Sequence, residues 1–156
     1  MRTTMKDSDE WETPKALFDQ LNNRFNFRWD CCCTVENCKV QTQIRWIGHG
    51  YNYLKYGFDN MLSTDSWLFL NPPYSKPAKF IKKAYKESRS WPIVCLLKCY
   101  TSTKWWGIFY DYEKQKPRPG VTIEYFPKRL KFERNGIPSS SANFPSCLVI
   151  LDRRDI

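Results

Sequence analysis

Long hydrophobic runs are absent from this 156-residue sequence. No stretch approaches the roughly 18 consecutive apolar residues that a membrane-spanning helix needs, so we expect no membrane association. Residues 1–9 are polar and lack the apolar core of a secretory signal peptide. These absences predict a cytoplasmic protein.

Histidine is almost absent too, and the cysteines are spaced in a way that suits neither a metal site nor disulfide bonds. His49 is the single histidine, and three of the seven cysteines are consecutive at Cys31, Cys32 and Cys33. Cys33 and Cys38 form a C-x4-C spacing, but no second pair or histidine set completes a zinc site. Adjacent cysteines also make a poor disulfide framework. We therefore expect no bound metal, and thiols that are reduced and partly buried.

Glycine is scarce as well, with six residues, and no glycine-rich loop of the dinucleotide-binding type follows a predicted strand. Positive charge, in contrast, is abundant: Lys and Arg number 25 against 16 Asp and Glu, which gives a formal net charge of +9. This surplus favours a polyanionic partner such as nucleic acid, although it also fits a soluble protein that simply carries many lysines. The length suits one domain, and a hydrophobic content of 42% allows a packed core.

Helical and strand patterns alternate along the chain, which predicts an α/β layered fold. Apolar residues at helical spacing predict helices over 13–25, 76–89 and 101–112. Thr13 is the expected N-cap of the first helix, with Pro14 at its first helical position. Short apolar runs predict strands over 27–33, 66–70, 93–97, 121–126 and 147–151, with a further strand considered at 43–47. A long polar segment, 127–145, joins the last two strands.

Asn71, Pro72, Pro73 and Tyr74 form the most informative motif. They follow directly after the apolar run S-W-L-F-L, and two prolines end both a strand and its hydrogen-bond ladder. Ligands in open α/β sheets bind outside the carboxyl ends of the strands, so the tetrapeptide lies where a binding site is expected. A proline turn with Asn71 as a turn residue is the alternative interpretation.

Several blocks occur in order around this motif. They are D-E-W-E-T-P at 9–14, F-R-W-D at 27–30, N-P-P-Y-S at 71–75, L-L at 96–97 with T-x-T-K-W-W at 101–106, R-L-K-F at 129–132 and F-P-S-C-L-V-I at 144–150. In this order the sequence resembles the phage-type DNA N-6-adenine methyltransferases, a Dam-like family, from about residue 9 to residue 151. It departs from the family at Lys98, Cys99 and Ser102, where a proline, a small residue and an aspartate are frequent.

The resemblance implies a Rossmann-like, S-adenosylmethionine-dependent methyltransferase fold: a single compact domain over 1–156 with a mostly parallel sheet and no separate target-recognition domain. Residues 1–9 are expected to form a flexible tail. It also implies a reaction, the transfer of a methyl group to the N6 amino group of adenine at specific sites in DNA. The location it implies is the cytoplasm of a bacterial or phage-infected cell.

The chemistry of that reaction explains the residues of the tetrapeptide. The lone pair of N6 is delocalised into the purine ring, so two acceptors directed at its N–H bonds would activate it and stabilise the positive charge that develops. We expect these acceptors to be the side-chain oxygen of Asn71 and the backbone carbonyl of Pro72, whose direction Pro72 and Pro73 fix. Tyr74 is expected to stack on a base that has left the duplex.

A second set of residues is expected to bind S-adenosylmethionine. Trp11, Thr13 and Pro14 resemble the N-terminal cofactor motif of the family, and Asp30, followed by the compact Cys31, resembles its first cofactor motif. A carboxylate suits the sulfonium and ammonium groups of this cofactor, and an aromatic side chain suits its adenine ring. A strand-end cap for Asp30 and core packing for Trp11 are the alternatives.

The acidic position before the catalytic strand has two candidates, Asp59 and Asn60, between which the sequence does not choose. Phe58, next to them, is a further candidate for the adenine slot. Asn71 is expected to contact the cofactor as well as the target base.

Basic residues are expected to bind DNA phosphates in two clusters, formed by Lys79, Lys83, Lys86 and by Lys128, Arg129, Lys131, Arg134. Lys114, Lys116 and Arg118 form a third cluster. Each cluster is also compatible with an ordinary solvated surface. Segment 134–143 is either a DNA-contacting loop or a flexible surface loop. No helix-turn-helix or zinc finger is recognisable, so recognition is either short or dependent on a homodimer.

Two other functions stay open. The same tetrapeptide serves enzymes that methylate RNA base amines or protein glutamine amides, and a degenerate methyltransferase fold could act as a DNA-binding module. Methylation at cytosine C5 is disfavoured, because that reaction needs a cysteine nucleophile, typically after proline, and no proline precedes a cysteine here.

Overall fold

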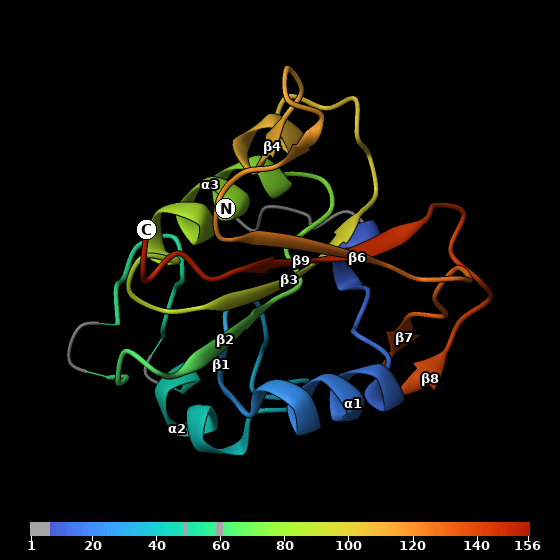
Figure 1. The fold of residues 1–156 in the computed structure, drawn as a ribbon. Coiled ribbons are helices and arrows are strands. Elements are labelled where there is room, and N and C mark those ends of the chain that lie inside the picture. The colour runs from blue at the N-terminus through green and yellow to red at the C-terminus, as the bar shows by residue number, and fades with distance from the viewer. Residues whose placement is uncertain (1–6, 49, 59–60) are drawn as a thin grey trace.

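The computed structural model describes residues 7–48, 50–58 and 61–156 of the chain. Its centre is a five-stranded sheet (Figure 1) in the order β1-β2-β3-β9-β6. The strands are β1 (Phe27–Asp30), β2 (Trp67–Leu70), β3 (Ile93–Lys98), β6 (Val121–Tyr125) and β9 (Ser146–Leu151). β1, β2 and β3 pair in parallel, whereas β9 is antiparallel to both of its neighbours, β3 and β6. All strands except β9 therefore run in one direction, and the predicted α/β architecture with a mostly parallel sheet is confirmed.

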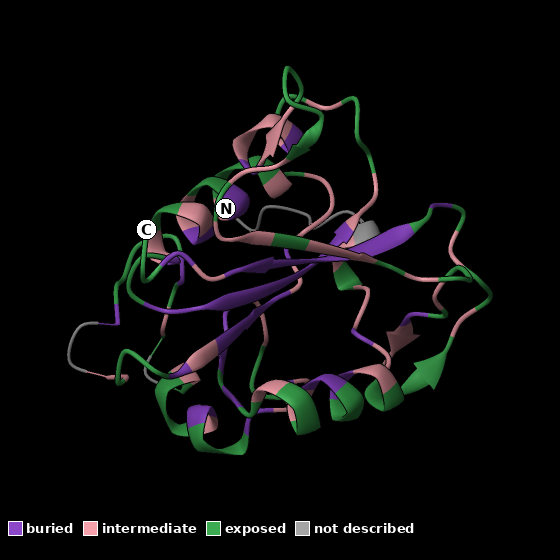
Figure 2. Ribbon diagram, in the orientation of Figure 1, coloured by how far each residue is buried: buried purple, intermediate pink, exposed green. Residues whose placement is uncertain are grey.

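Alternate residues along the strands enter two apolar clusters on opposite faces of the sheet. In β3, Val94 and Leu96 belong to one cluster, while Ile93, Cys95 and Leu97 belong to the other. A strand that is buried on both faces reads as a continuous apolar run, which is why this strand was recognisable in the sequence. Figure 2 shows the buried residues concentrated in these central strands.

The two longest helices each cover one of these faces. α1 (Lys15–Phe25) places Phe18 and Leu21 in the cluster that contains Val94 and Leu96. α3 (Pro77–Glu87) places Ile81 and Ala84 in the cluster on the other face, so the two helices lie on opposite sides of the sheet (Figure 1). Both helices were predicted, and their amphipathic patterns account for the faces they bury.

The predicted helix over 101–112 is wrong. The segment forms turns, the single-turn 3₁₀ helix η3 (Trp106–Ile108) and then β4 (Tyr110–Asp111), which pairs with β5 (Lys116–Pro117). Its backbone bonds join residues three apart, as in Trp106 N–H to Thr103 O and Phe109 N–H to Trp106 O. The buried residues Trp106 and Phe109 share this spacing of three, which the sequence does not distinguish from the α-helical pattern over so short a stretch.

The strand considered at 43–47 is also wrong. Residues Gln41–Gln43 form the 3₁₀ helix η2, and Ile44–Ile47 form the short helix α2. The side chain of Gln43 replaces a strand instead: its Oε1 accepts the backbone N–H of Asp30 at 2.6 Å and its Nε2 donates to the Asp30 carbonyl at 2.6 Å. A side-chain amide thus satisfies the outer edge of β1 at the point where a neighbouring strand would otherwise pair.

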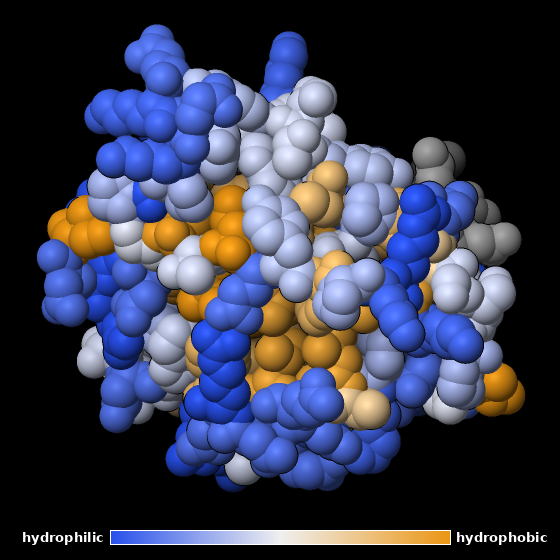
Figure 3. All heavy atoms as spheres, turned by 45° about the vertical axis from the view of Figure 1, so that its right-hand side comes forward, coloured by the Kyte–Doolittle hydropathy of each residue, from blue (hydrophilic) through white to orange (hydrophobic). Residues whose placement is uncertain are grey.

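The polar segment 127–145 contains the two-residue strands β7 (Glu133–Arg134) and β8 (Ile137–Pro138), which form a small hairpin. Phe132 and Phe144 from this segment are buried in the same cluster as α1. Figure 3 shows that hydrophobic side chains gather in the middle of the face seen there, with hydrophilic side chains around them. The N-terminal 3₁₀ helix η1 (Asp7–Glu10) leads into a backbone bridge between Glu12 and Glu133. The flexible tail expected over residues 1–9 is therefore wrong for residues 7–9, because η1 forms there and Asp9 accepts hydrogen bonds from Ser75, while residues 1–6 lie outside the described residues. Within the described part of the chain, no helix is long and apolar enough to cross a membrane.

Candidate active site

Asn71, Pro72, Pro73 and Tyr74 lie at the carboxyl end of β2, in the middle of the parallel part of the sheet. A cavity of about 470 Å³ opens there, beside the carboxyl end of the neighbouring strand β1. Eight predicted site residues line it: Trp11, Thr13, Asp30, Cys31, Asn71, Pro72, Pro73 and Tyr74. The structure therefore brings together the predicted catalytic tetrapeptide and most of the predicted cofactor residues, which come from three separate blocks of the sequence.

The side-chain amide of Asn71 has a defined orientation. Its Nδ2 donates to Thr13 Oγ1 at 3.1 Å and lies 3.5 Å from the backbone carbonyl oxygen of Trp11. Asn71 Oδ1 accepts no hydrogen bond from the residues that the structure describes, and the backbone carbonyl of Pro72 likewise accepts none from them. The motif thus carries two acceptors without protein donors, a side-chain oxygen and a main-chain oxygen.

The loop that follows the tetrapeptide is held by the N-terminal segment. Asp9 accepts hydrogen bonds from the backbone N–H of Ser75 at 2.9 Å and from the Ser75 hydroxyl at 2.6 Å. The same carboxylate lies near Lys98. The pKa of the Lys98 ammonium is below its usual value, because burial lowers it by more than the charge of Asp9 raises it. Asp9 belongs to the block that also contains Trp11 and Thr13, so this block contacts the tetrapeptide at Asn71 and the loop after it at Ser75.

Asp30 is a buried carboxyl at the floor of the cavity. Burial raises its pKa to about 6, and this rise is opposed by the backbone N–H of Cys32, which donates to Oδ1 at 3.1 Å, and by the charge of Lys39. A carboxyl with this pKa loses its proton more readily when a positive group lies beside it. Asp30 is therefore suited to a cationic ligand.

The ring of Tyr74 packs against two buried phenylalanine side chains. The residue is half-buried, yet its hydroxyl is enclosed and has no hydrogen-bond partner among the described residues. The ring meets Phe132 and Phe144 edge-on at centroid distances of 5.8 Å and 5.4 Å. Burial accordingly raises the pKa of the Tyr74 hydroxyl well above its usual range. Tyr74 also lines the cavity that contains Asn71.

A second cavity of about 240 Å³ shares Tyr74 with the first. It is lined by Tyr74, Ser75, Pro77, Leu97, Lys98, Tyr100 and Trp105. The ammonium of Lys98 lies 4.3 Å from the ring centroid of Phe144, 5.2 Å from that of Tyr74 and 5.4 Å from that of Tyr100. The lining of the second cavity is thus largely aromatic and includes one positive charge, that of Lys98.

Comparison with known proteins assigns the chain to a family. The family described as DNA N-6-adenine-methyltransferase (Dam) matches residues 1–153. The chain belongs to this family. It is 28% identical over 160 aligned positions to the DNA N-6-adenine-methyltransferase of Haemophilus phage HP1 (strain HP1c1), with 96% of this chain and 82% of the phage protein covered. The resemblance inferred from the sequence blocks is therefore confirmed, and the activity is the methylation of adenine N6 in DNA.

Two positions where this Dam-family member departs from the common pattern lie beside the second cavity. Lys98 ends β3 and lines the cavity, and Cys99 continues the pairing with the last strand by donating its N–H to the Pro145 carbonyl at 2.9 Å. Ser102, the third, is exposed. Of these three residues, Lys98 alone lines the second cavity, and none of them lines the first.

Not every predicted site residue lies in the cavity of this Dam-family chain. Pro14 is the N-cap of α1, a position predicted for Thr13, and Pro14 does not line the cavity. Asp59 and Asn60 lie outside the described residues. Five lining residues were not predicted as site residues from the sequence: Asp9, Tyr51, Tyr53 and Phe80, which line the first cavity, and Tyr100, which lines the second. Of these five residues, Asp9 alone stands in one of the sequence blocks that carried the resemblance, so it alone could have been predicted as a site residue.

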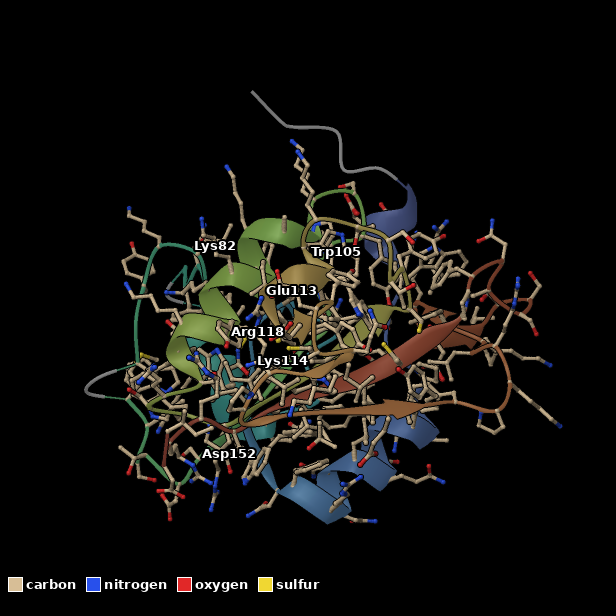
Figure 4. The ribbon with its side chains drawn as sticks, turned by 45° about the horizontal axis from the view of Figure 1, so that its top comes forward. Lys82, Trp105, Glu113, Lys114, Arg118 and Asp152 are labelled. Carbon is tan, nitrogen blue, oxygen red and sulfur yellow. The ribbon has the colours of Figure 1, made fainter. Side chains whose placement is uncertain are left out.

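The predicted DNA-binding residues of this chain differ in whether a carboxylate lies beside their positive charge. Lys79, Lys86, Lys128, Arg129 and Lys131 are exposed. In contrast, Lys83 lies 2.7 Å from Glu87 Oε1, and Arg134 lies 3.7 Å from Glu10 Oε2 with its guanidinium 5.1 Å from the Trp11 ring centroid. In the third cluster, Arg118 donates to the Gly107 carbonyl, and Figure 4 shows it with Lys114 on the side of the sheet that carries Lys82 of α3.

The seven cysteines are free thiols, and Cys31, Cys38, Cys95 and Cys147 are buried. In the described ranges, no group of three or more His, Cys, Asp or Glu side chains is arranged to hold a metal ion.

Proposed function

We propose that this chain binds S-adenosylmethionine in the cavity of about 470 Å³ and transfers its methyl group to an adenine that has left the DNA duplex. The observation that carries the proposal is the pair of acceptors without protein donors, Asn71 Oδ1 and the Pro72 carbonyl, beside a buried carboxyl. An amino group has two N–H bonds to donate, and two acceptors at one strand end match that requirement.

The residues of the first cavity fit the cofactor. Its volume lies within the roughly 300–1,000 Å³ typical of small-molecule sites. Asp30 supplies a counter-charge for a cation, and Trp11 and Tyr51 supply aromatic surface for a purine. S-adenosylmethionine, when bound, supplies an electrophilic methyl group on a positively charged sulfur. Phe58 is fully buried against Trp29 and Tyr51, so under this proposal it packs behind the slot rather than forming it.

Asn71 and Pro72 activate the target. Asn71 Oδ1 and the Pro72 carbonyl accept the two N–H bonds of N6 and thereby localise its lone pair on nitrogen. The same oxygens would stabilise the positive charge on N6 as the new C–N bond forms and the methyl–sulfur bond breaks, with S-adenosylhomocysteine as the leaving group, before N6 loses one proton to solvent. A general base is not required before the transfer, because the nitrogen becomes acidic once it carries the methyl group.

The second cavity holds the target base in this proposal. At about 240 Å³ it is too small for a typical cofactor site, yet its aromatic walls suit one planar ring system. Tyr74 offers its ring to the base, and Lys98 adds a donor and a positive charge at the wall. Stacking on aromatic side chains helps to repay the cost of removing a base from the duplex.

The exposed lysines and arginines contact the phosphate backbone. Lys79 and Lys86 extend from α3, and Lys128, Arg129 and Lys131 precede the β7–β8 hairpin. Lys83 faces Glu87 and Arg134 faces Glu10. These two cations add to the positive electrostatic potential of the surface, but either must give up its ion pair to contact a phosphate. Such contacts position the protein on DNA without reading its sequence.

Three wider features complete the proposal. The sheet with helices on both faces is a Rossmann-like methyltransferase fold, and residues 1–156 form one domain. The chain acts in the cytoplasm of a bacterial or phage-infected cell, where its DNA substrate is accessible, and a homodimer supplies site specificity beyond what one small domain reads.

Parallel substrates test the proposal. Labelled methyl groups from S-adenosylmethionine are offered to unmethylated DNA, RNA and a protein extract, and every labelled product is digested to nucleosides or amino acids. We expect N6-methyladenine from DNA alone. Label in RNA or protein would overturn the substrate, and the absence of both label and cofactor binding would favour a degenerate DNA-binding module.

A further inference from the structure

From the contacts of the Asn71 amide we infer that Thr13 is a positioning residue for methyl transfer, which fixes the direction of Asn71 Oδ1, rather than a residue that binds cofactor. This inference rests on the proposed function, because it concerns the acceptor that activates the target amino group. The two ends of a carboxamide have similar shape but opposite hydrogen-bonding roles. Only one of its two orientations presents an acceptor to N6.

The surroundings of Asn71 select that orientation. The Trp11 carbonyl oxygen, 3.5 Å from Nδ2, can only accept, so the end of the amide that faces it must be the donor. Thr13 Oγ1, at 3.1 Å, accepts from the same Nδ2. A reversed amide would place Oδ1 against the Trp11 carbonyl and would direct Nδ2 at the N–H bonds of the substrate, where donor meets donor.

The hydroxyl of Thr13 is free for this role because it does not cap α1. Thr13 stands just before the helix, and a threonine there normally accepts a backbone N–H of the first turn. In this chain the N-cap is Pro14, and the first-turn N–H of Lys15 donates to Glu133 Oε1 at 3.1 Å, while Thr13 Oγ1 accepts no backbone N–H from the described residues. Thr13 is only 6% exposed, so its hydroxyl is held among protein groups and directed at Asn71, a residue 58 positions away.

The roles of positioning residue and cofactor ligand predict different kinetics for Thr13→Val, which keeps the shape and removes the hydroxyl. If Thr13 positions Asn71, kcat falls by roughly tenfold or more, while the Kd of S-adenosylmethionine and the KM of DNA change by less than about twofold. Thr13→Ser, which restores the acceptor, recovers most of the rate. Thr122→Val, at an exposed position on β6, is the matched control and keeps full kcat.

A spectroscopic measurement tests the inference independently of activity. In ¹⁵N-labelled protein, the side-chain amide signals of Asn71 are identified by their loss in Asn71→Ala, and their hydrogen exchange is compared with that of Asn23, which is exposed on α1. We expect slow exchange for Asn71 in the wild type and faster exchange in Thr13→Val. If the side-chain amide of Asn71 in the wild type exchanged its hydrogens as fast as that of Asn23, the inference would be overturned. This result does not depend on whether the protein methylates DNA.

The two arms separate the inference from the proposed function. A wild type that methylates no adenine contradicts the proposed function, while the amide exchange still decides the role of Thr13. A wild type that methylates DNA, with a Thr13→Val variant that has unchanged kcat and a raised Kd for S-adenosylmethionine, contradicts the inference alone and makes Thr13 a cofactor ligand.

Discussion

Asp9 and Ser75 are 66 positions apart, and the Asp9 carboxylate accepts both the backbone N–H and the hydroxyl of Ser75. Two hydrogen bonds to a charged acceptor thus join the N-terminal segment to the loop that follows the catalytic tetrapeptide. Ser75 directly follows Tyr74, so this contact restrains the aromatic wall shared by both cavities. The N-terminal segment is itself held by the backbone bridge between Glu12 and Glu133 of β7, so the contact of Asp9 with Ser75 links the tetrapeptide to that bridge.

Asp9→Ala tests the importance of this contact. We expect the free energy of unfolding to fall by about 1–2 kcal/mol, since hydrogen bonds to charged groups are among the stronger ones, and kcat to fall with it. Thermal denaturation and steady-state methylation measure the two effects. Asp155→Ala, at an exposed carboxylate near the C-terminus, is the control; equal behaviour of the two variants would show that the contact restrains nothing.

The raised pKa of Asp30 predicts a pH dependence of cofactor binding. In the free protein this pKa is about 6, so above pH 6 the carboxylate is ready for a cation, while below pH 6 it must first lose a proton. The affinity for S-adenosylmethionine should therefore be constant above about pH 7 and fall as pH decreases through 6, by up to tenfold per pH unit. Calorimetric titrations between pH 5 and pH 8 measure this.

Asp30→Asn is the control for that experiment. The amide keeps the shape and can still accept the Cys32 N–H, but it has no charge to lose. We expect weaker binding that no longer depends on pH in this range. A pH dependence that persists unchanged in Asp30→Asn would assign the titration to another group.

The enclosed hydroxyl of Tyr74 leads to an unusual expectation for its two substitutions. Tyr74→Phe removes a buried group without a described partner, so the free energy of unfolding should rise by roughly 1 kcal/mol and most activity should remain. Tyr74→Ala removes the ring and should lower kcat/KM for DNA by roughly 10- to 100-fold, the worth of one stacked base. Chemical denaturation and kinetics separate the two, and a large loss of activity in Tyr74→Phe would assign a direct role to the hydroxyl.

Lys98 is expected to act on DNA rather than on the cofactor. Lys98→Met keeps the length of the side chain and removes its charge from the wall of the second cavity. We predict a KM for DNA that rises by about tenfold, with the Kd of S-adenosylmethionine unchanged. Lys55→Met, at an exposed lysine outside both cavities, should leave both values as they are. A change in cofactor affinity alone would place the base elsewhere.

The salt dependence of DNA binding tests the phosphate contacts. Replacing both Lys128 and Lys131 by alanine should reduce the slope of log K against log salt concentration by about 2, since each lost phosphate contact removes roughly 0.9. Fluorescence anisotropy at several salt concentrations measures the slope. A slope equal to that of the wild type would show that these two lysines only face solvent.

The sequence predicted the parts of the fold whose signals are local. The continuous apolar runs of β3 and β9, and the amphipathic faces of α1 and α3, each follow from residues within one segment. The tetrapeptide was placed correctly for the same reason, because prolines that follow an apolar run end a strand. The ordered blocks then identified the family, which the structure alone does not name.

The errors arose where a contact from another segment decides the conformation. Gln43 belongs to a 3₁₀ turn because its amide completes the edge of β1, and nothing near Gln43 in the sequence shows this. Thr13 looked like a helix cap, but its hydroxyl serves Asn71. Phe132 and Phe144 stand in a polar segment, and only the folded chain shows that they support the ring of Tyr74.

The most direct test of the account is to measure methyl transfer and cofactor binding side by side for the wild type and Asn71→Ala. The account predicts N6-methyladenine in DNA from the wild type, and at least a hundredfold lower kcat in Asn71→Ala with the Kd of S-adenosylmethionine changed by no more than a few fold. Substantial methyl transfer by Asn71→Ala, with the product still N6-methyladenine, would contradict the role of Asn71 Oδ1 as the acceptor that activates the adenine.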